Sequence, residues 1–173
     1  MIASCSHESA AELAALPLTG DEECAFLQCG EPATLGANLP FPLINDATRG
    51  ARFTNELGYD GSIRFSKQTA GLAILDECRR AWARQERDVE FNLLMHMAIS
   101  APPFECLINP MDQRFQNAED MPAKIQAFCR ETNQIVPRKP AQVARCILES
   151  IALNYRKVLD ELEALSSTRF SRI

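Results

Sequence analysis

Apolar residues recur at helical spacing in four segments of the chain. These segments are residues 67–85, 89–99, 120–132 and 140–165. The last is the longest, and one apolar stripe along it is formed by Val143, Ile147, Ile151, Val158, Leu162 and Leu165. Asp120 is a suitable N-cap for the third segment, where Pro122 lies in the first turn. The pattern therefore predicts four helices, and Pro102-Pro103 ends the second of them.

Short apolar runs predict three strands nearer the N-terminus. They are Ile2–Ser6, Ala25–Gln28 and Thr34–Leu39. The last two flank the turn Gly30-Glu31-Pro32, so we expect them to pair as a hairpin. Short strands followed by several helices indicate an α/β or α+β fold, and a length of 173 residues suggests one domain.

Charge and hydropathy exclude two classes of partner. The net charge is −5 and there is no run of basic residues, which argues against nucleic acid and anionic membrane surfaces. No apolar run approaches the roughly 20 residues that span a bilayer. The first residues also lack the pattern of a signal peptide, so we expect a cytoplasmic protein.

The seven cysteines do not form a recognisable metal or redox motif. They are Cys5, Cys24, Cys29, Cys78, Cys106, Cys129 and Cys146. No pair has C-x-x-C spacing, so the simplest interpretation is reduced, mostly buried thiols. A zinc site built from these cysteines and the two histidines has no supporting spacing, and no metal ligand is predicted.

The segment 53–80, FTNELGYDGSIRFSKQTAGLAILDECRR, carries the most specific signal. Lys67 is expected at a helix start beside small residues, where unpaired backbone N–H groups suit an anion such as phosphate. The segment resembles the rhamnulokinases, ATP-dependent sugar kinases of the FGGY carbohydrate kinase family. Other segments also resemble the family, and they occur along the chain in the same order as in the family. They are residues 3–17, 26–36, 101–115, 120–134 and 145–165.

The resemblance implies a fold and a parent activity. The fold is a partial actin-like (ribonuclease H-like) ATPase domain, with residues 1–173 as a truncated second domain of a longer kinase. Residues 169–173 then resemble the beginning of a strand that is cut short. The parent activity is phosphorylation of L-rhamnulose in L-rhamnose breakdown, with ATP and Mg²⁺ as cofactors. We expect the isolated chain to be inactive and its open edges to allow self-association.

On the sugar side, the resemblance assigns roles to His7 and Glu8. His7 matches a sugar contact, and Glu8 matches an aspartate that acts as the general base. The longer glutamate displaces the carboxylate by about 1 Å, which can cost on the order of a hundredfold in rate. The alternative is an exposed His-Glu pair that caps the helix starting near Ser9.

On the nucleotide side, the resemblance assigns Gly30, Glu31, Gln68 and Asp76. Glu31 replaces a threonine that contacts phosphate, Gln68 replaces an asparagine, and Asp76 replaces a glutamine. We expect Glu8 and Glu31 to face one cleft with Lys67 on its rim, which makes the cleft more negative than polyphosphate favours. These departures support an alternative function, a non-catalytic pseudokinase remnant that binds a sugar or a protein. An unrelated helical interaction module is a third possibility.

Overall fold

The computed structural model describes residues 11, 15, 23–58, 61–85, 89–117 and 119–173. The predicted strand Ile2–Ser6 and the candidate residues His7 and Glu8 lie outside these residues. Contacts divide the chain into two compact units. The sheet unit comprises the described residues up to Cys29, Ala33–Gln68 and Lys157–Ile173, and the helical unit comprises Gly30–Pro32 and Thr69–Arg156.

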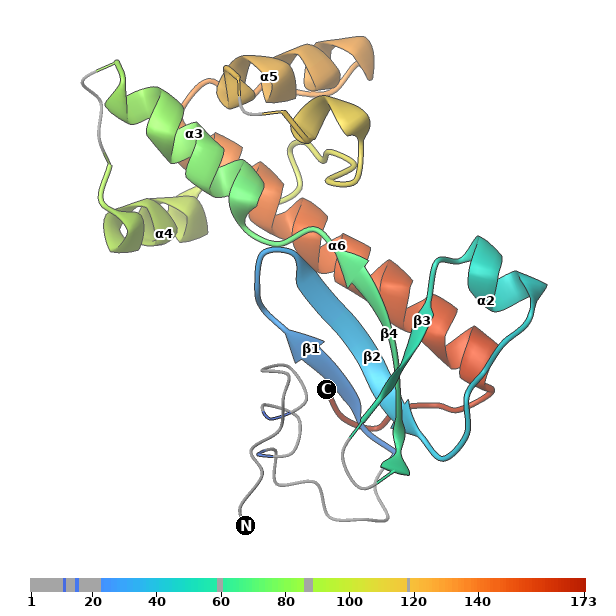
Figure 1. Cartoon of the computed structure of the whole chain (residues 1–173). Coiled ribbons are helices and arrows are strands. Elements are labelled where there is room, and N and C mark those ends of the chain that lie inside the picture. Colours follow the sequence, from blue (N-terminus) through green and yellow to red (C-terminus); the bar gives the residue numbers. More distant parts are fainter. Residues whose placement is uncertain (1–10, 12–14, 16–22, 59–60, 86–88, 118) are drawn as a thin grey trace. The chain divides into compact units, whose positions relative to one another are not determined.

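Within the described residues, the sheet unit is built on four strands with the order β1-β2-β4-β3 (Figure 1). The strands are β1 (Ala25–Gln28), β2 (Ala33–Leu39), β3 (Thr54–Leu57) and β4 (Ile63–Thr69). β1 and β2 pair antiparallel with Gln28 opposite Thr34, which confirms the predicted hairpin. A short helix, α2 (Asp46–Gly50), follows β2, and Asn45 and Thr48 cap it reciprocally.

A close backbone approach holds β2 against β4 at Gly36. A Cβ atom at this position would lie 2.4 Å from the carbonyl oxygen of Phe65 and 2.5 Å from Cβ of Ser66. Only glycine fits there without moving the neighbouring strand. Phe65 itself is fully buried and stacks on Phe53 with ring centroids 4.8 Å apart, so this contact lies in the core of the sheet unit.

The predicted helix start at Lys67 is wrong. Lys67 and Gln68 belong to β4, and the helix that follows, α3 (Ala73–Ala83), begins only after Gly71. The buried residues of β4 include Arg64, Phe65 and Ser66 in succession, so this strand lacks the simple alternation that identifies a half-buried strand. The apolar pattern does not predict β3 either, because three of its four residues are exposed.

The last residues of the chain pair in parallel with the segment that enters β1. Ala25 N donates to the Arg172 carbonyl at 2.9 Å, and Ser171 N donates to the Glu23 carbonyl at 3.0 Å. This extended pairing agrees with the expectation that residues 169–173 resemble the beginning of a strand. The sheet unit thus combines an antiparallel hairpin with a parallel neighbour on the far side of β1.

The described part of the helical unit contains three helices and part of a fourth. They are α3, α4 (Phe91–Ser100), α5 (Met121–Glu131) and the first part of α6 (Pro140–Ser166), and a 3₁₀ turn, η2 (Gln113–Phe115), precedes α5. As predicted, Asp120 caps α5 by accepting from Ala123 N at 3.3 Å. The bounds of α4, α5 and α6 agree with the predicted segments to within two residues at each end, so these three predictions are confirmed.

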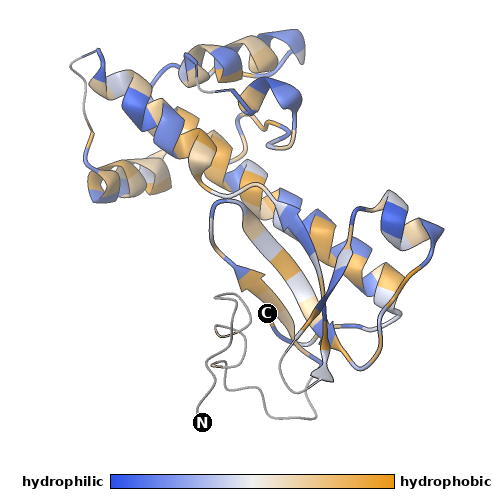
Figure 2. Cartoon of the chain, viewed as in Figure 1, coloured by the Kyte–Doolittle hydropathy of each residue, from blue (hydrophilic) through white to orange (hydrophobic). Residues whose placement is uncertain are grey.

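α6 is amphipathic along its whole length. Apolar and polar residues are interspersed on it (Figure 2). The predicted stripe is buried from Val143 to Leu162, whereas Leu165 is only partly buried. Its residues up to Arg156 belong to the helical unit and the later ones to the sheet unit. Among the described residues, no helix combines the length and the apolar character needed to cross a membrane.

Candidate functional site

The turn Gly30-Glu31-Pro32 packs against the start of α3, and this contact is the candidate nucleotide-side site. Gly71, which precedes the helix, is buried. A Cβ atom on Gly71 would lie 2.2 Å from the Gly30 carbonyl oxygen and 2.7 Å from Oε2 of Glu31. The turn therefore reaches the backbone of the helix start directly, and no side chain separates the two.

Glu31 caps α3 from this turn. Its Oε2 accepts a hydrogen bond from Ala73 N at 2.6 Å. The N-cap residue of α3, Leu72, offers no side-chain acceptor, so Glu31 satisfies a donor that the helix itself cannot. A carboxylate also interacts favourably with the partial positive charge at a helix N-terminus. The position that suits an anionic ligand is thus occupied by a side chain of the protein itself.

Asp76 lies one turn further along α3. Its carboxylate is 3.6 Å from Nη1 of Arg79, and half of the side chain is exposed. Together with Arg79, Arg80 and Ala83 it lines a shallow hollow of about 300 Å³. Arg79 also lies over the ring of Phe91, so its guanidinium is held by contacts within the helical unit. Asp76 is thus partly neutralised by its neighbour on the same helix.

Gln68 and Lys67 are placed on β4 rather than at a helix start. Gln68 is exposed on the strand and belongs to the sheet unit. Nζ of Lys67 pairs with Oε2 of Glu161 at 2.6 Å and lies over the ring of Phe53. The Lys67 ammonium is thus engaged within the sheet unit and does not lie at a helix start.

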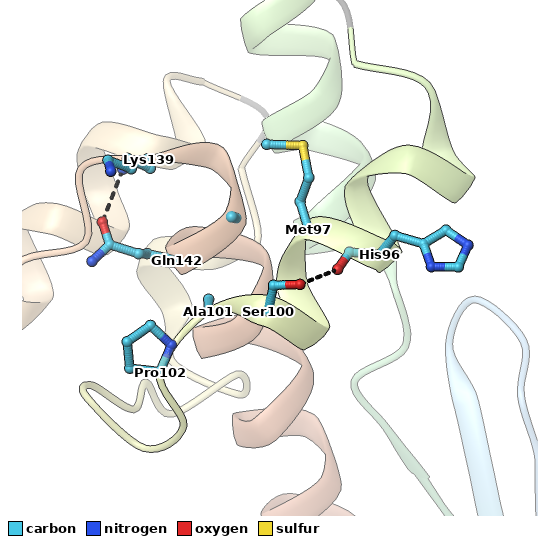
Figure 3. A pocket seen from close by; sticks show the side chains of 8 residues that line it. His96, Met97, Ser100, Ala101, Pro102, Lys139 and Gln142 are labelled. Carbon is cyan, nitrogen blue, oxygen red and sulfur yellow. Dashed lines mark hydrogen bonds between the residues drawn. The ribbon is translucent and has the colours of Figure 1, made fainter.

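A separate hollow of about 590 Å³ lies between the end of α4 and the start of α6 (Figure 3). Its lining includes His96, Met97, Lys139 and Gln142. The His96 imidazole points away from Lys139 and Gln142, and the hydrogen bonds drawn there join side chains to backbone atoms (Figure 3). The hollow therefore does not bring an imidazole and an amine together as an acid–base pair.

Of the predicted site residues, the structure brings Gly30 and Glu31 to the start of the helix that carries Asp76. His7 and Glu8 lie outside the described residues, so the expected Glu8–Glu31 cleft stays a prediction. Sequence reasoning does not assign Gly71, which permits the close contact. The sequence signal that marks Gly71 is a glycine just before the N-cap of α3, within the segment that resembles the rhamnulokinases.

The fold and the sequence together define the class of protein. Residues 25–173 match the FGGY family of carbohydrate kinases, C-terminal domain, and the chain belongs to this family. The α/β architecture agrees with the actin-like fold expected from the resemblance.

One relative in sequence and one neighbour in structure are similar to the chain. It is 40% identical over 166 residues to a rhamnulokinase of Bacteroides thetaiotaomicron, a match that covers 96% of this chain and 33% of that protein. The xylulose kinase from Bifidobacterium adolescentis matches in structure with a TM-score of 0.53, at 16% identity, over 88% of this chain and 28% of that one. This chain thus spans about a third of the length of the rhamnulokinase. Family membership excludes the unrelated helical module.

Proposed function

We propose that the chain is part of the C-terminal domain of a sugar kinase whose substrate is L-rhamnulose. The 40% identity to a rhamnulokinase over nearly the whole chain carries this proposal. The parent activity transfers a phosphoryl group from ATP to a sugar hydroxyl, with Mg²⁺ on the phosphates. In this proposal Glu8 is the general base, His7 contacts the sugar, and the turn with Gly30 lies on the nucleotide side.

The contacts at the start of α3 weigh against a polyphosphate bound there. The backbone donor at the start of α3 is taken by Glu31, and Asp76 adds a second carboxylate to the same helix. Glu31 is exposed and so is half of the Asp76 side chain, so solvent screens their repulsion of a phosphate, and the occupied backbone donor is the main obstacle. A phosphate at this helix start would have to displace the Glu31 carboxylate. This observation favours the second candidate function, a non-catalytic pseudokinase remnant.

The isolated chain should show no turnover of ATP with L-rhamnulose. Phosphoryl transfer depends on groups placed on both sides of the transferred phosphate, and this chain matches a third of its kinase relative. A coupled ADP-release assay is the measurement, with a full-length rhamnulokinase as the positive control. Turnover in the usual kinase range of about 1–100 per second would contradict the prediction.

Replacing Glu31 with threonine should tighten binding of Mg-ATP by about tenfold, or 1.4 kcal/mol. The variant frees Ala73 N and removes a negative charge from the helix start. Calorimetric titration of both chains with Mg-ATP measures the difference. Asp46→Asn is the matched control, because it removes one exposed carboxylate from the first turn of α2 and should leave the affinity unchanged.

The two titrations separate the candidate functions. If the affinity for Mg-ATP rises in Glu31→Thr but not in Asp46→Asn, the turn lies on the nucleotide side and Glu31 blocks it. Equal affinities in the parent chain and in Glu31→Thr would mean that this turn does not face nucleotide, and the remnant function would then be favoured.

A further inference from the structure

Three cysteines from distant parts of the sequence meet inside the helical unit. Cys106 lies in the loop after α4, Cys129 lies in α5 and Cys146 lies in α6. Their Sγ atoms all lie within 4.8 Å of one another. The three residues are 4%, 0% and 2% exposed, so water is excluded from the cluster. Their spacing along the chain does not predict this meeting, because the three cysteines lie in three different segments of the fold.

Buried hydrogen bonds hold the loop of Cys106 in place. Ile108 N donates to Oγ of Ser150 at 2.9 Å, and the same hydroxyl donates to the Cys146 carbonyl at 2.6 Å. The side chain of Gln134 makes two hydrogen bonds to the backbone of the adjacent residue, Leu107. Its Oε1 accepts from Leu107 N, and its Nε2 donates to the Leu107 carbonyl. The three sulfur atoms are therefore positioned by the fold before any ligand arrives.

The donor set selects a soft ion with few ligands. Three sulfur atoms without oxygen or nitrogen do not suit Mg²⁺ or Ca²⁺. Structural zinc and iron–sulfur clusters use four protein ligands. Among the described residues, no histidine, carboxylate or further cysteine joins the three. Three-coordinate binding by sulfur alone points to a monovalent thiophilic cation.

Burial and mutual hydrogen bonding shift the pKa values of the three thiols. Hydrogen bonding with Cys146, and to a smaller extent with Cys129, lowers the pKa of Cys106. Burial raises the pKa of Cys129 to about 12. The pKa of Cys146 is raised too, first by its hydrogen bond to Cys106 and then by burial. The ion is selected by geometry, because three buried sulfur atoms leave no exposed fourth position of the kind that a zinc ion with three protein ligands keeps for water.

We propose that Cys106, Cys129 and Cys146 form a binding site for Cu(I). As copper binds, one of the three thiols loses its proton to solvent, and the resulting thiolate and the two neutral thiols form a trigonal set of ligands. The copper stays in the Cu(I) state and no sulfur is oxidised, so the step needs no further reactant. Soft sulfur ligands are those that Cu(I) prefers in proteins.

Anaerobic titration with Cu(I), in competition with a chromogenic Cu(I) chelator, tests the site. One Cu(I) per chain is expected, with a charge-transfer absorption in the ultraviolet. Cys106→Ser, Cys129→Ser and Cys146→Ser should each weaken binding by about a hundredfold. The double variant Cys24→Ser/Cys29→Ser is the matched control, because these two thiols lie outside the cluster and it should bind like the parent.

A measurement on the unaltered chain covers the case in which a core serine prevents folding. Cu(I) should protect the three clustered cysteines from alkylation during partial unfolding, while Cys29, which is exposed, stays reactive. Mass spectrometry of the digested chain measures the extent of alkylation at each cysteine. Equal alkylation with and without Cu(I), loss of binding in the control variant, or a disulfide between two of the three cysteines in the reduced preparation would overturn the proposal.

Discussion

Replacing Gly36 with valine should destabilise the sheet unit by about 3 kcal/mol, the upper range for overpacking a core. The new Cβ would lie 2.4 Å from a carbonyl oxygen and 2.8 Å from a Cα atom of β4, and neither can rotate away. β2 and β4 would have to separate, with loss of their pairing. Hydrogen exchange of the β2 and β4 amides and urea denaturation both measure this loss.

Gly50→Ala is the control for this variant. Gly50 lies in α2, and a Cβ atom there meets nothing within 4 Å. Alanine should leave the free energy of unfolding unchanged or raise it by up to about 1 kcal/mol, because alanine favours helix over glycine. If Gly36→Val were as stable as Gly50→Ala, the close approach of β2 and β4 would be disproved.

Replacing Ile147 with alanine should lower the free energy of unfolding of the helical unit by about 2–5 kcal/mol. Ile147 is 0% exposed and packs in the core cluster with Leu75, Ile125 and Val143. Truncation removes buried methyl groups and leaves a cavity that the surrounding helices fill only in part. The measurement is the urea denaturation midpoint, followed by exchange of amides in α3 and α5.

Leu153→Ala on the same helix serves as the comparison. Leu153 is 48% exposed, so its truncation should cost much less than that of Ile147. Equal losses for the two variants would mean that α6 does not bury the face described above.

The features that local sequence can predict are those set by neighbouring residues. The turn Gly30-Glu31-Pro32 and the hairpin around it follow from turn chemistry. The start of α5 follows from Asp120 and Pro122, and α6 follows from its apolar stripe. Each of these depends on a few residues that are close in the sequence, and the structure confirms each.

The features that local sequence cannot predict depend on residues far apart. The apolar pattern assigns the end of β4, from Lys67, to the beginning of a helix, because the burial of this strand depends on the strands on both sides of it. Turn chemistry correctly places Glu31 in a turn. The hydrogen bond from Ala73 N to the Glu31 carboxylate cannot be predicted in this way, because β2, β3 and β4 separate the two residues along the chain. The cysteine cluster likewise arises only once α5 and α6 have packed together with the loop of Cys106.

The contact between Gly71 and the turn at Gly30 has a consequence for evolution. As long as the turn keeps its place, position 71 is closed to every residue with a side chain, whatever the chemistry at position 31. A homologue with alanine or a larger residue at position 71 must carry its turn elsewhere. Its own helix start would then be open to solvent or to a ligand. The residue at position 71 thus distinguishes relatives in which this turn covers the start of the helix from relatives in which it does not.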